Sequence, residues 1–357
     1  MKVSLVLGSG GARGYAHIGV IEEIKRRGHE IVAISGTSMG SLIGGLEAAG
    51  KLDDFADWAT SLTHLDVFRL YDPAFSQPGV IKADKIFQMV NSFVDNVQIE
   101  DLEIPFTAVA TDIVNHREVW FQRGDLVTAM RASCALPTFI APIMVNGKIL
   151  ADGGLVNPVP VEPTSAIPSD VTISVSLSGR PNTILSTSAV NDEHSEKYEE
   201  DDGLKLADRL RRGVAGLMDA NIFRRDDKES EGADSASSEP SEGAGLLSEE
   251  MFGDETKAQL AETESATQVT GEGPAGPLDA WNEVGKLPAN LNTMGVVNMA
   301  LETMQSMIER YRAAANPVNV KIDVPSAVCG TLDFHKASEV IETGRQLAID
   351  AFDDMGL

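Results

Sequence analysis

The sequence predicts a three-layer α/β/α domain with a mainly parallel central sheet, and three observations support this fold class. Short apolar runs rich in β-branched residues alternate with segments of helical periodicity, which is the pattern of a layered α/β protein. A glycine-rich segment at 8–14 follows the first of these runs, and a G-x-S-x-G pattern at 36–40 follows the second. A helical pattern comes after each of the two glycine segments, so both occupy a strand-to-helix turn.

The first predicted strand, 2–7, leads through the glycine-rich segment into a predicted helix at 15–27. A dinucleotide fingerprint that began at Gly8 would need a glycine at the position of Arg13, and no acidic residue follows the second strand. We therefore set dinucleotide binding aside. A loop of backbone N–H groups that opens a helix suits an anion or an oxyanion instead.

The second glycine turn lies between a predicted strand at 31–35 and a predicted helix at 41–49. In this setting Ser38 is a candidate nucleophile at an elbow, where a side chain two residues to either side would collide with the neighbouring strand or helix. The N-terminus of the following helix favours negative charge that develops on the serine oxygen. The alternative interpretation is a glycine-rich turn in which Ser38 only caps the helix.

The rest of the chain continues the alternation of strands and helices. A hairpin at 143–150 turns on Asn146-Gly147 and leads to Asp152, a carboxylate in a glycine turn. The other predicted helices are 52–62, 83–94, 125–134, 290–315 and 333–352, the other predicted strands are 105–114, 118–121, 171–177 and 318–324, and 71–79 is a turn-rich loop.

Composition divides the chain into a core at 1–180, an acidic low-complexity insertion at 181–284, and a helix–strand–helix segment at 285–357 that completes the core. Residues 191–280 hold 24 acidic and 9 basic side chains, and so account for most of the net charge of −25. Residues 229–277 bury too little apolar surface to fold, so we expect their removal to leave the core intact. One amphipathic helix is predicted inside it at 204–223, which either packs on the core or docks on a membrane or a partner.

Charge and composition exclude several classes of protein. The excess of acidic side chains argues against binding to nucleic acid, which needs clustered Lys and Arg. Cys134 and Cys329 provide neither a disulfide framework nor metal-ligand spacing, and we expect no metal and no cofactor. Apolar runs are too short for a membrane span or a signal peptide, so we expect a cytoplasmic protein. Peripheral contact with the inner face of the membrane and the oligomeric state are left open.

A nucleophilic Ser38 needs a general base, and the sequence offers two candidates. An α/β-hydrolase places its histidine late in the chain, and His335 is the only histidine that is late and within a predicted ordered segment. Asp152 is a different solution, because a carboxylate in a tight glycine turn can reach the serine directly.

Three motifs in this order, SGGARG at 9–14, GTSMG at 36–40 and DGG at 152–154, resemble the patatin-like phospholipase family. The resemblance is closest to the bacterial branch similar to neuropathy target esterase; it covers about 1–180, and TLDFH at 331–335 resembles the C-terminal end of that branch. It implies a patatin-like fold and a serine esterase that hydrolyses lipid acyl esters, with phospholipids or lysophospholipids as substrates.

By this resemblance Ser38 is the nucleophile and Asp152 its general base, in a dyad rather than a triad. The oxyanion donors are the backbone N–H groups of Gly10, Gly11, Ala12 and Arg13. Ser9 departs from the family pattern, which has its first glycine there. The Arg13 side chain either forms a surface ion pair, braces the loop, or meets a substrate phosphate.

Two alternatives to the dyad esterase stay open. The first is a Ser-His-Asp triad esterase that uses His335. The second is a regulatory or scaffold protein with little hydrolase activity, whose acidic insertion binds partners.

Overall fold

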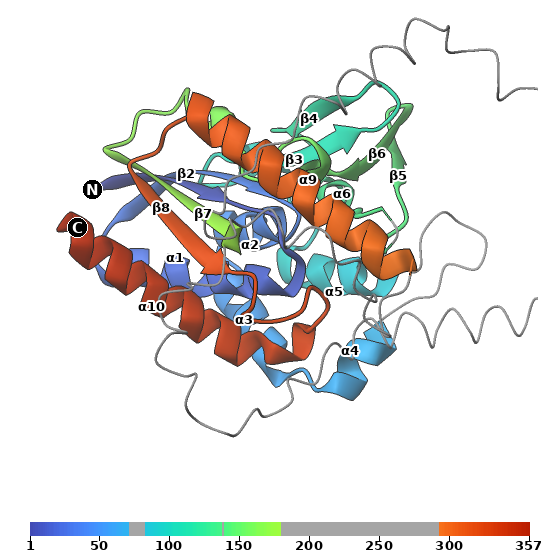
Figure 1. Ribbon diagram of the computed structural model, residues 1–357, viewed down its shortest axis with the longest axis horizontal. Coiled ribbons are helices and arrows are strands. Elements are labelled where there is room, and N and C mark those ends of the chain that lie inside the picture. The colour runs from blue at the N-terminus through green and yellow to red at the C-terminus, as the bar shows by residue number, and fades with distance from the viewer. Residues whose placement is uncertain (71–82, 138, 180–292) are drawn as a thin grey trace, which may run out of the picture. The chain divides into compact units, whose positions relative to one another are not determined.

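The computed structural model describes residues 1–70, 83–137, 139–179 and 293–357 (Figure 1). Strands and helices alternate along these residues, as the sequence predicts. The predicted acidic insertion at 181–284, with its amphipathic helix, and the predicted loop at 71–79 lie outside the described residues.

The strands within the described ranges form one sheet in the order β5-β6-β3-β2-β1-β7-β8, and β4 pairs with β3 outside this path. They are β1 (Lys2–Leu7), β2 (Glu30–Thr37), β3 (Phe106–Asp112), β4 (Arg117–Phe121), β5 (Ile143–Val145), β6 (Lys148–Asp152), β7 (Val171–Gly179) and β8 (Val320–Pro325). The pairings among β3, β2, β1, β7 and β8 are parallel, whereas those that involve β4, β5 and β6 are antiparallel. The prediction of a mainly parallel sheet is therefore confirmed.

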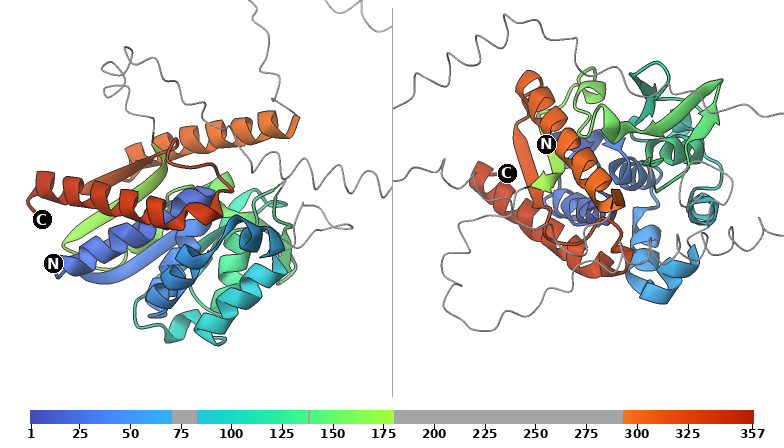
Figure 2. Two further views of the ribbon diagram at one scale, coloured as in Figure 1. Left: turned by 90° about the horizontal axis from the view of Figure 1, so that it is seen from below. Right: turned by 45° about the vertical axis from the view of Figure 1, so that its right-hand side comes forward.

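The direction in which the chain moves across the sheet determines the helix layers. From β1 the chain moves to β2 and β3 in one direction, and from β7 to β8 in the other, so right-handed crossovers put the intervening helices on opposite faces. Helices α1 and α2 thus cover one face and α9 the other, and α10 packs along α1 (Figures 1 and 2). The helices are α1 (Ala16–Arg26), α2 (Met39–Ala48), α3 (Leu52–Ser61), α4 (His64–Leu70), α5 (Asp84–Val94), α6 (Leu126–Ser133), α9 (Thr293–Ala315) and α10 (Ala337–Met355).

The two faces of the sheet are packed differently. On β8, Val320, Ile322 and Val324 are buried, whereas Lys321 between them reaches Glu309 of α9 in an ion pair of 3.5 Å. Successive side chains of a strand point to opposite faces of the sheet. The face covered by α1 therefore holds the apolar core, and the face covered by α9 contacts that helix through polar side chains.

The structure differs from the predicted elements at several places. The predicted glycine loop closes into a 3-10 helix, η1 (Gly11–Tyr15), and the predicted final helix begins as a 3-10 turn, η7 (Phe334–Lys336). Helix α4 was not predicted, because its seven residues are too short for a periodic pattern. No helix of the described residues is both long and apolar enough to cross a membrane.

Candidate active site

The elbow around Ser38 has the close contacts that its two glycines were expected to relieve. A Cβ atom on Gly36 would lie 2.3 Å from the carbonyl oxygen of Gly40, and one on Gly40 would lie 2.1 Å from that of Leu7 on β1. Ser38 itself has φ 56° and ψ −125°, a conformation that a non-glycine residue adopts only where the surrounding structure enforces it. The backbone therefore leaves the direction of β2 at Ser38, directly before α2 begins.

The Ser38 side chain does not act as a helix cap. Ser38 occupies the position before the first residue of α2, yet its side chain makes no capping hydrogen bond. Its carbonyl oxygen accepts hydrogen bonds from the N–H groups of Ser41 and Leu42, and from the Ser41 hydroxyl at 2.7 Å. The hydroxyl of Ser38 is thus left for other chemistry, which removes the reason for the capping interpretation.

The register of β3 brings Asp152 next to the elbow. Val109 pairs with Thr37 of β2, and the next residue, Ala110, pairs with Asp152 of β6. Both residues of β3 also pair with β4, so β2 and β6 must share the other edge of β3. The carboxyl ends of β2 and β6 therefore meet along the same edge of β3. The turn that holds Ser38 follows β2, and the turn that holds Asp152 ends β6.

The glycine after Asp152 makes this close approach feasible. A Cβ atom on Gly153 would lie 2.1 Å from the carbonyl oxygen of Val109 and 3.0 Å from the Thr37 methyl carbon. The Asp152 backbone is held on both sides: its N–H donates to Ala135 O at 2.9 Å, and its carbonyl oxygen accepts from the Thr111 hydroxyl at 2.8 Å.

The Asp152 carboxyl is wholly buried, and this changes its acidity. Oδ1 accepts a hydrogen bond from the Gly154 N–H at 2.7 Å, whereas Oδ2 has no hydrogen-bond partner among the described residues. Burial raises the pKa of Asp152 to about 6, although the Ser38 hydroxyl and the Gly154 N–H both act to lower it. The carboxylate is therefore a stronger base than an exposed aspartate and interacts with Ser38. Its Oδ2 atom has no hydrogen-bond partner among the described residues.

The glycine-rich segment supplies fewer free donors than the sequence suggests. The amides of Gly8 and Ser9 donate to Val175 O and Pro158 O, and the Ala12 amide donates to Thr331 O at 2.9 Å. In a 3-10 helix that begins at Gly11, the Arg13 amide donates its hydrogen bond to the carbonyl oxygen three residues earlier. The amides of Gly10 and Gly11 remain as candidate donors, whereas those of Ala12 and Arg13 are engaged, which corrects the prediction for both residues.

The Arg13 side chain braces this segment. It is buried rather than exposed, so the interpretation as a surface ion pair is wrong. Nε donates to Gly10 O at 3.2 Å, and Nη2 donates to Glu302 of α9 at 2.9 Å and to the Thr331 hydroxyl at 3.3 Å.

Beneath the segment, buried His17 donates from Nε2 to Gly8 O at 2.9 Å, and burial lowers its pKa to about 4. His17 is thus a neutral support of the loop.

The structure puts His335 elsewhere. Its ring stacks on that of His64 at the start of α4, with 3.6 Å between ring centroids, and burial lowers its pKa. No hydrogen bond links His335 to Ser38 or Asp152 within the described residues. The triad alternative therefore finds no support in this arrangement.

Cys134 is a second nucleophilic residue close to Ser38. Burial, together with the negative charge of Asp152, raises the pKa of its thiol to about 12, although the hydroxyls of Ser41 and Ser38 act in the opposite direction. A thiol with that pKa is protonated at neutral pH, so Cys134 does not compete with Ser38 as a nucleophile.

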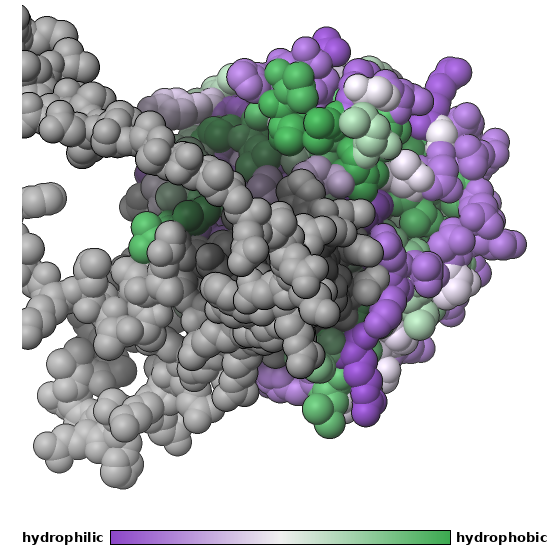
Figure 3. Space-filling view, turned by 90° about the vertical axis from the view of Figure 1, so that its right-hand side faces the viewer, coloured by the Kyte–Doolittle hydropathy of each residue, from purple (hydrophilic) through white to green (hydrophobic). Residues whose placement is uncertain are grey.

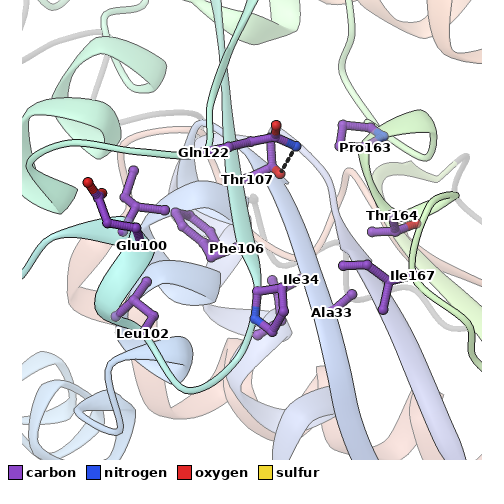
Figure 4. Close-up of a pocket in the computed structure, with 12 residues that line it drawn as sticks. Ala33, Ile34, Glu100, Leu102, Phe106, Thr107, Gln122, Pro163, Thr164 and Ile167 are labelled. Atoms are coloured by element: carbon purple, nitrogen blue, oxygen red, sulfur yellow. Dashed lines mark hydrogen bonds between the residues drawn. The ribbon is translucent and has the colours of Figure 1, made fainter.

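A cavity of about 260 Å³ lies beside the middle of β2, and its lining includes Ile34, Phe106 and Ile167 (Figure 4). At its margin, Gln122 donates a hydrogen bond of 3.1 Å to the Thr107 hydroxyl (Figure 4). Neither Ser38 nor Asp152 lines this cavity, so it is separate from the candidate reacting groups. Figure 3 shows apolar side chains gathered on one face of the molecular surface. Ile113 and Val114, which follow β3, and Met144 of β5 are among the exposed apolar residues.

Sequence reasoning missed the residues that hold these groups in place. Ser133 accepts a hydrogen bond from the Ser38 N–H across 95 residues of sequence, and the Ala12 amide reaches Thr331 far along the chain. A small residue at the end of a predicted helix gives no local sign of such a contact, because only the fold brings the partners together.

Comparison with known proteins identifies relatives of the chain. The family model for patatin-like phospholipases matches residues 5–165. An uncharacterized NTE family protein of Mycobacterium tuberculosis is 40% identical over 359 residues, which cover 99% of this chain and 91% of the relative. Lysophospholipase NTE1 of Cryptococcus neoformans is 32% identical over 170 residues, which are 45% of this chain and 10% of that protein. The crystal structure of VipD from Legionella pneumophila aligns with a TM-score of 0.41 and 11% identity, over 99% of this chain and 66% of that one.

Proposed function

The chain belongs to the patatin-like phospholipase family, in the branch of its NTE family relatives, and we propose that it is a serine esterase that works through Ser38 and Asp152. Membership of this family implies hydrolysis of lipid acyl esters. The finer assignment, to the acyl esters of phospholipids or lysophospholipids, is part of the proposal and is suggested by the name of the Cryptococcus relative.

In the first half of the proposed reaction, Asp152 takes the hydroxyl proton of Ser38 as Oγ attacks the ester carbonyl carbon. The tetrahedral oxyanion then lies against the amides of Gly10 and Gly11. Its collapse breaks the ester bond, and the departing alcohol takes the proton from Asp152. Each oxyanion donor is typically worth about 10² to 10³ in rate.

In the second half, water attacks the acyl group on Ser38 while Asp152 accepts a proton from it. Collapse of this second intermediate releases the fatty acid, and the proton returns to Ser38. No imidazole takes part, because the carboxylate contacts both nucleophiles directly.

The observation that carries the proposal is the register of β3. Consecutive residues of one strand, Val109 and Ala110, pair with the residue before Ser38 and with Asp152 itself. The unoccupied Oδ2 of Asp152 and its pKa of about 6 support the role of general base, since a base is most effective when its pKa lies near the working pH.

The two alternative functions are less well supported. A triad esterase would need His335 within hydrogen-bond reach of Ser38, and His335 stacks on His64 instead. A scaffold without activity would leave the strained elbow, the buried carboxyl and the spare Gly10 and Gly11 amides without a use.

The proposal is tested by the release of fatty acid from lysophosphatidylcholine and from phosphatidylcholine vesicles by the purified protein. We expect release by the wild type, none by Ser38→Ala, and nearly full release by His335→Ala. If Ser38→Ala still released fatty acid at the wild-type rate, the assignment of the nucleophile would be wrong. A phospholipid substrate would also bring this protein to a membrane surface as a peripheral protein, which binding to the same vesicles measures.

A further inference from the structure

The residues at the end of α6 contact the backbones of both proposed reacting residues. Ser133 is the last residue of α6, and Cys134 and Ala135 follow it. The hydroxyl of Ser133 accepts a hydrogen bond from the Ser38 N–H at 2.9 Å, and Ala135 O accepts one from the Asp152 N–H at 2.9 Å. One turn of chain, three residues long, therefore holds the nucleophile at one end and the base at the other.

The orientation of the Ser133 hydroxyl is fully determined. Besides accepting from Ser38, it donates to Val109 O at 2.6 Å, and the side chain is completely buried. A hydroxyl that donates along one direction and accepts along another cannot rotate without breaking a bond. Because the Ser133 side chain is fully buried, either broken bond would leave a buried backbone group without a partner.

The place of this hydroxyl in the sheet explains why Ser38 depends on it. The parallel ladder between β2 and β3 ends at Thr37 and Val109, one residue before Ser38. The chain then turns into the strained conformation of φ 56° and ψ −125°, in which the Ser38 N–H leaves the ladder. Ser133 closes the gap, since its oxygen bridges that N–H to the carbonyl of Val109.

We propose that Ser133 is a positioning residue of the nucleophile, which fixes the elbow against β3 so that the Ser38 hydroxyl faces Asp152. This inference rests on the proposed function of Ser38 and Asp152. Ser133 does not touch substrate: it acts through the Ser38 backbone. Ala135 holds Asp152 with a main-chain oxygen, whereas Ser133 holds the Ser38 backbone with its side-chain hydroxyl.

The test compares Ser133→Ala with a matched control, Ser41→Ala. Both substitutions remove a buried hydroxyl that binds the Ser38 backbone. In Ser41→Ala, however, Ser38 O keeps the amides of Ser41 and Leu42, whereas Ser133→Ala leaves the Ser38 N–H with no partner. The measurement is the second-order rate at which a fluorophosphonate labels Ser38, together with kcat and KM for a soluble short-chain ester and thermal unfolding of each variant.

We expect labelling and kcat to fall on the order of 10²-fold in Ser133→Ala, with KM unchanged, because a reacting group displaced by about 1 Å loses that much. Ser41→Ala should stay within about threefold of the wild type, since its acceptor remains satisfied. The acid limb of the pH profile should move to higher pH in Ser133→Ala, because a displaced Ser38 hydroxyl no longer lowers the pKa of Asp152, and should stay in place in Ser41→Ala. Ser133→Cys, which keeps the shape of serine with a slightly larger atom that is only a weak acceptor, should lie between wild type and Ser133→Ala and serves where the alanine variant does not fold.

Wild-type labelling in a folded Ser133→Ala or Ser133→Cys variant would overturn the inference. An equal loss in Ser41→Ala would also overturn it, since the effect would then be one of general packing. Absence of labelling in the wild type would instead contradict the proposed function, and is distinguishable because no variant is needed to observe it.

Discussion

The buried carboxyl of Asp152 should make the folded protein less stable above about pH 6, and Asp152→Asn should remove this loss of stability. The carboxyl has no access to solvent, and its pKa is raised from 3.8 to about 6. Two pKa units correspond to about 3 kcal/mol of free energy between the protonated and the ionised form. An asparagine has nearly the same shape and no charge, so the variant avoids this cost.

The sign follows from proton linkage. The folded protein holds a proton on Asp152 between pH 3.8 and about 6, whereas the unfolded chain releases it. The contribution of Asp152 to the free energy of unfolding is therefore complete below pH 3.8, falls as the pH rises to about 6, and stays low above that. We expect Asp152→Asn to be about 3 kcal/mol more stable than the wild type at pH 8, and about as stable near pH 4.

Urea unfolding at a series of pH values measures this difference, and Asp112→Asn is a control of opposite sign. Hydrogen bonds from Asn115 and Val114 hold the pKa of Asp112 below its usual value, so its contribution is present above that value and is lost as the pH falls. Asp112→Asn should therefore destabilise the protein at pH 8. If Asp152→Asn were no more stable than the wild type at pH 8, or equally stabilised at pH 4, the reasoning from burial would be refuted.

Three further substitutions test the surroundings of the site by steady-state kinetics on a soluble ester. Arg13→Ala should lower kcat about tenfold or more because the side chain holds the segment that carries the oxyanion donors, whereas Glu302→Gln should change it less than about threefold, since Glu302 is 51% exposed; equal losses would contradict the bracing role. His335→Ala should stay within about twofold of the wild type, and a folded but inactive variant would reinstate the triad. Gly153→Ala should abolish activity, because its Cβ would lie 2.1 Å from the carbonyl oxygen of Val109; an active variant would show that the turn has room.

Local sequence patterns were enough to predict the strands, the elbow and the glycine turn of Asp152. Gly36 and Gly40 are needed for contacts with residues close in sequence or on the neighbouring strand, so a short motif reports them. The fold class followed from the alternation of strands and helices, and the family followed from three motifs in order; both predictions are confirmed.

The contacts that complete the site depend on long-range pairing and could not be predicted in this way. No local pattern indicates that β6 pairs antiparallel with β3 on the same edge as β2, beyond the residue where the pairing with β2 ends. Likewise, the Ala12 amide is occupied because Thr331, from the far end of the chain, packs against it. The sequence left the role of Arg13 open between a surface ion pair, a brace of the loop and a contact with a substrate phosphate, because only the fold supplies Glu302 and Thr331 as partners.

The most direct test of a Ser38–Asp152 dyad is to trap its covalent intermediate. The protein is mixed with a soluble activated ester, quenched in acid within one turnover, digested, and analysed by mass spectrometry. We predict a single acyl adduct on the peptide that contains Ser38, formed equally fast in His335→Ala and on the order of 10²-fold more slowly in Asp152→Asn. An adduct on another residue, or formation in Asp152→Asn at the wild-type rate, would contradict the dyad.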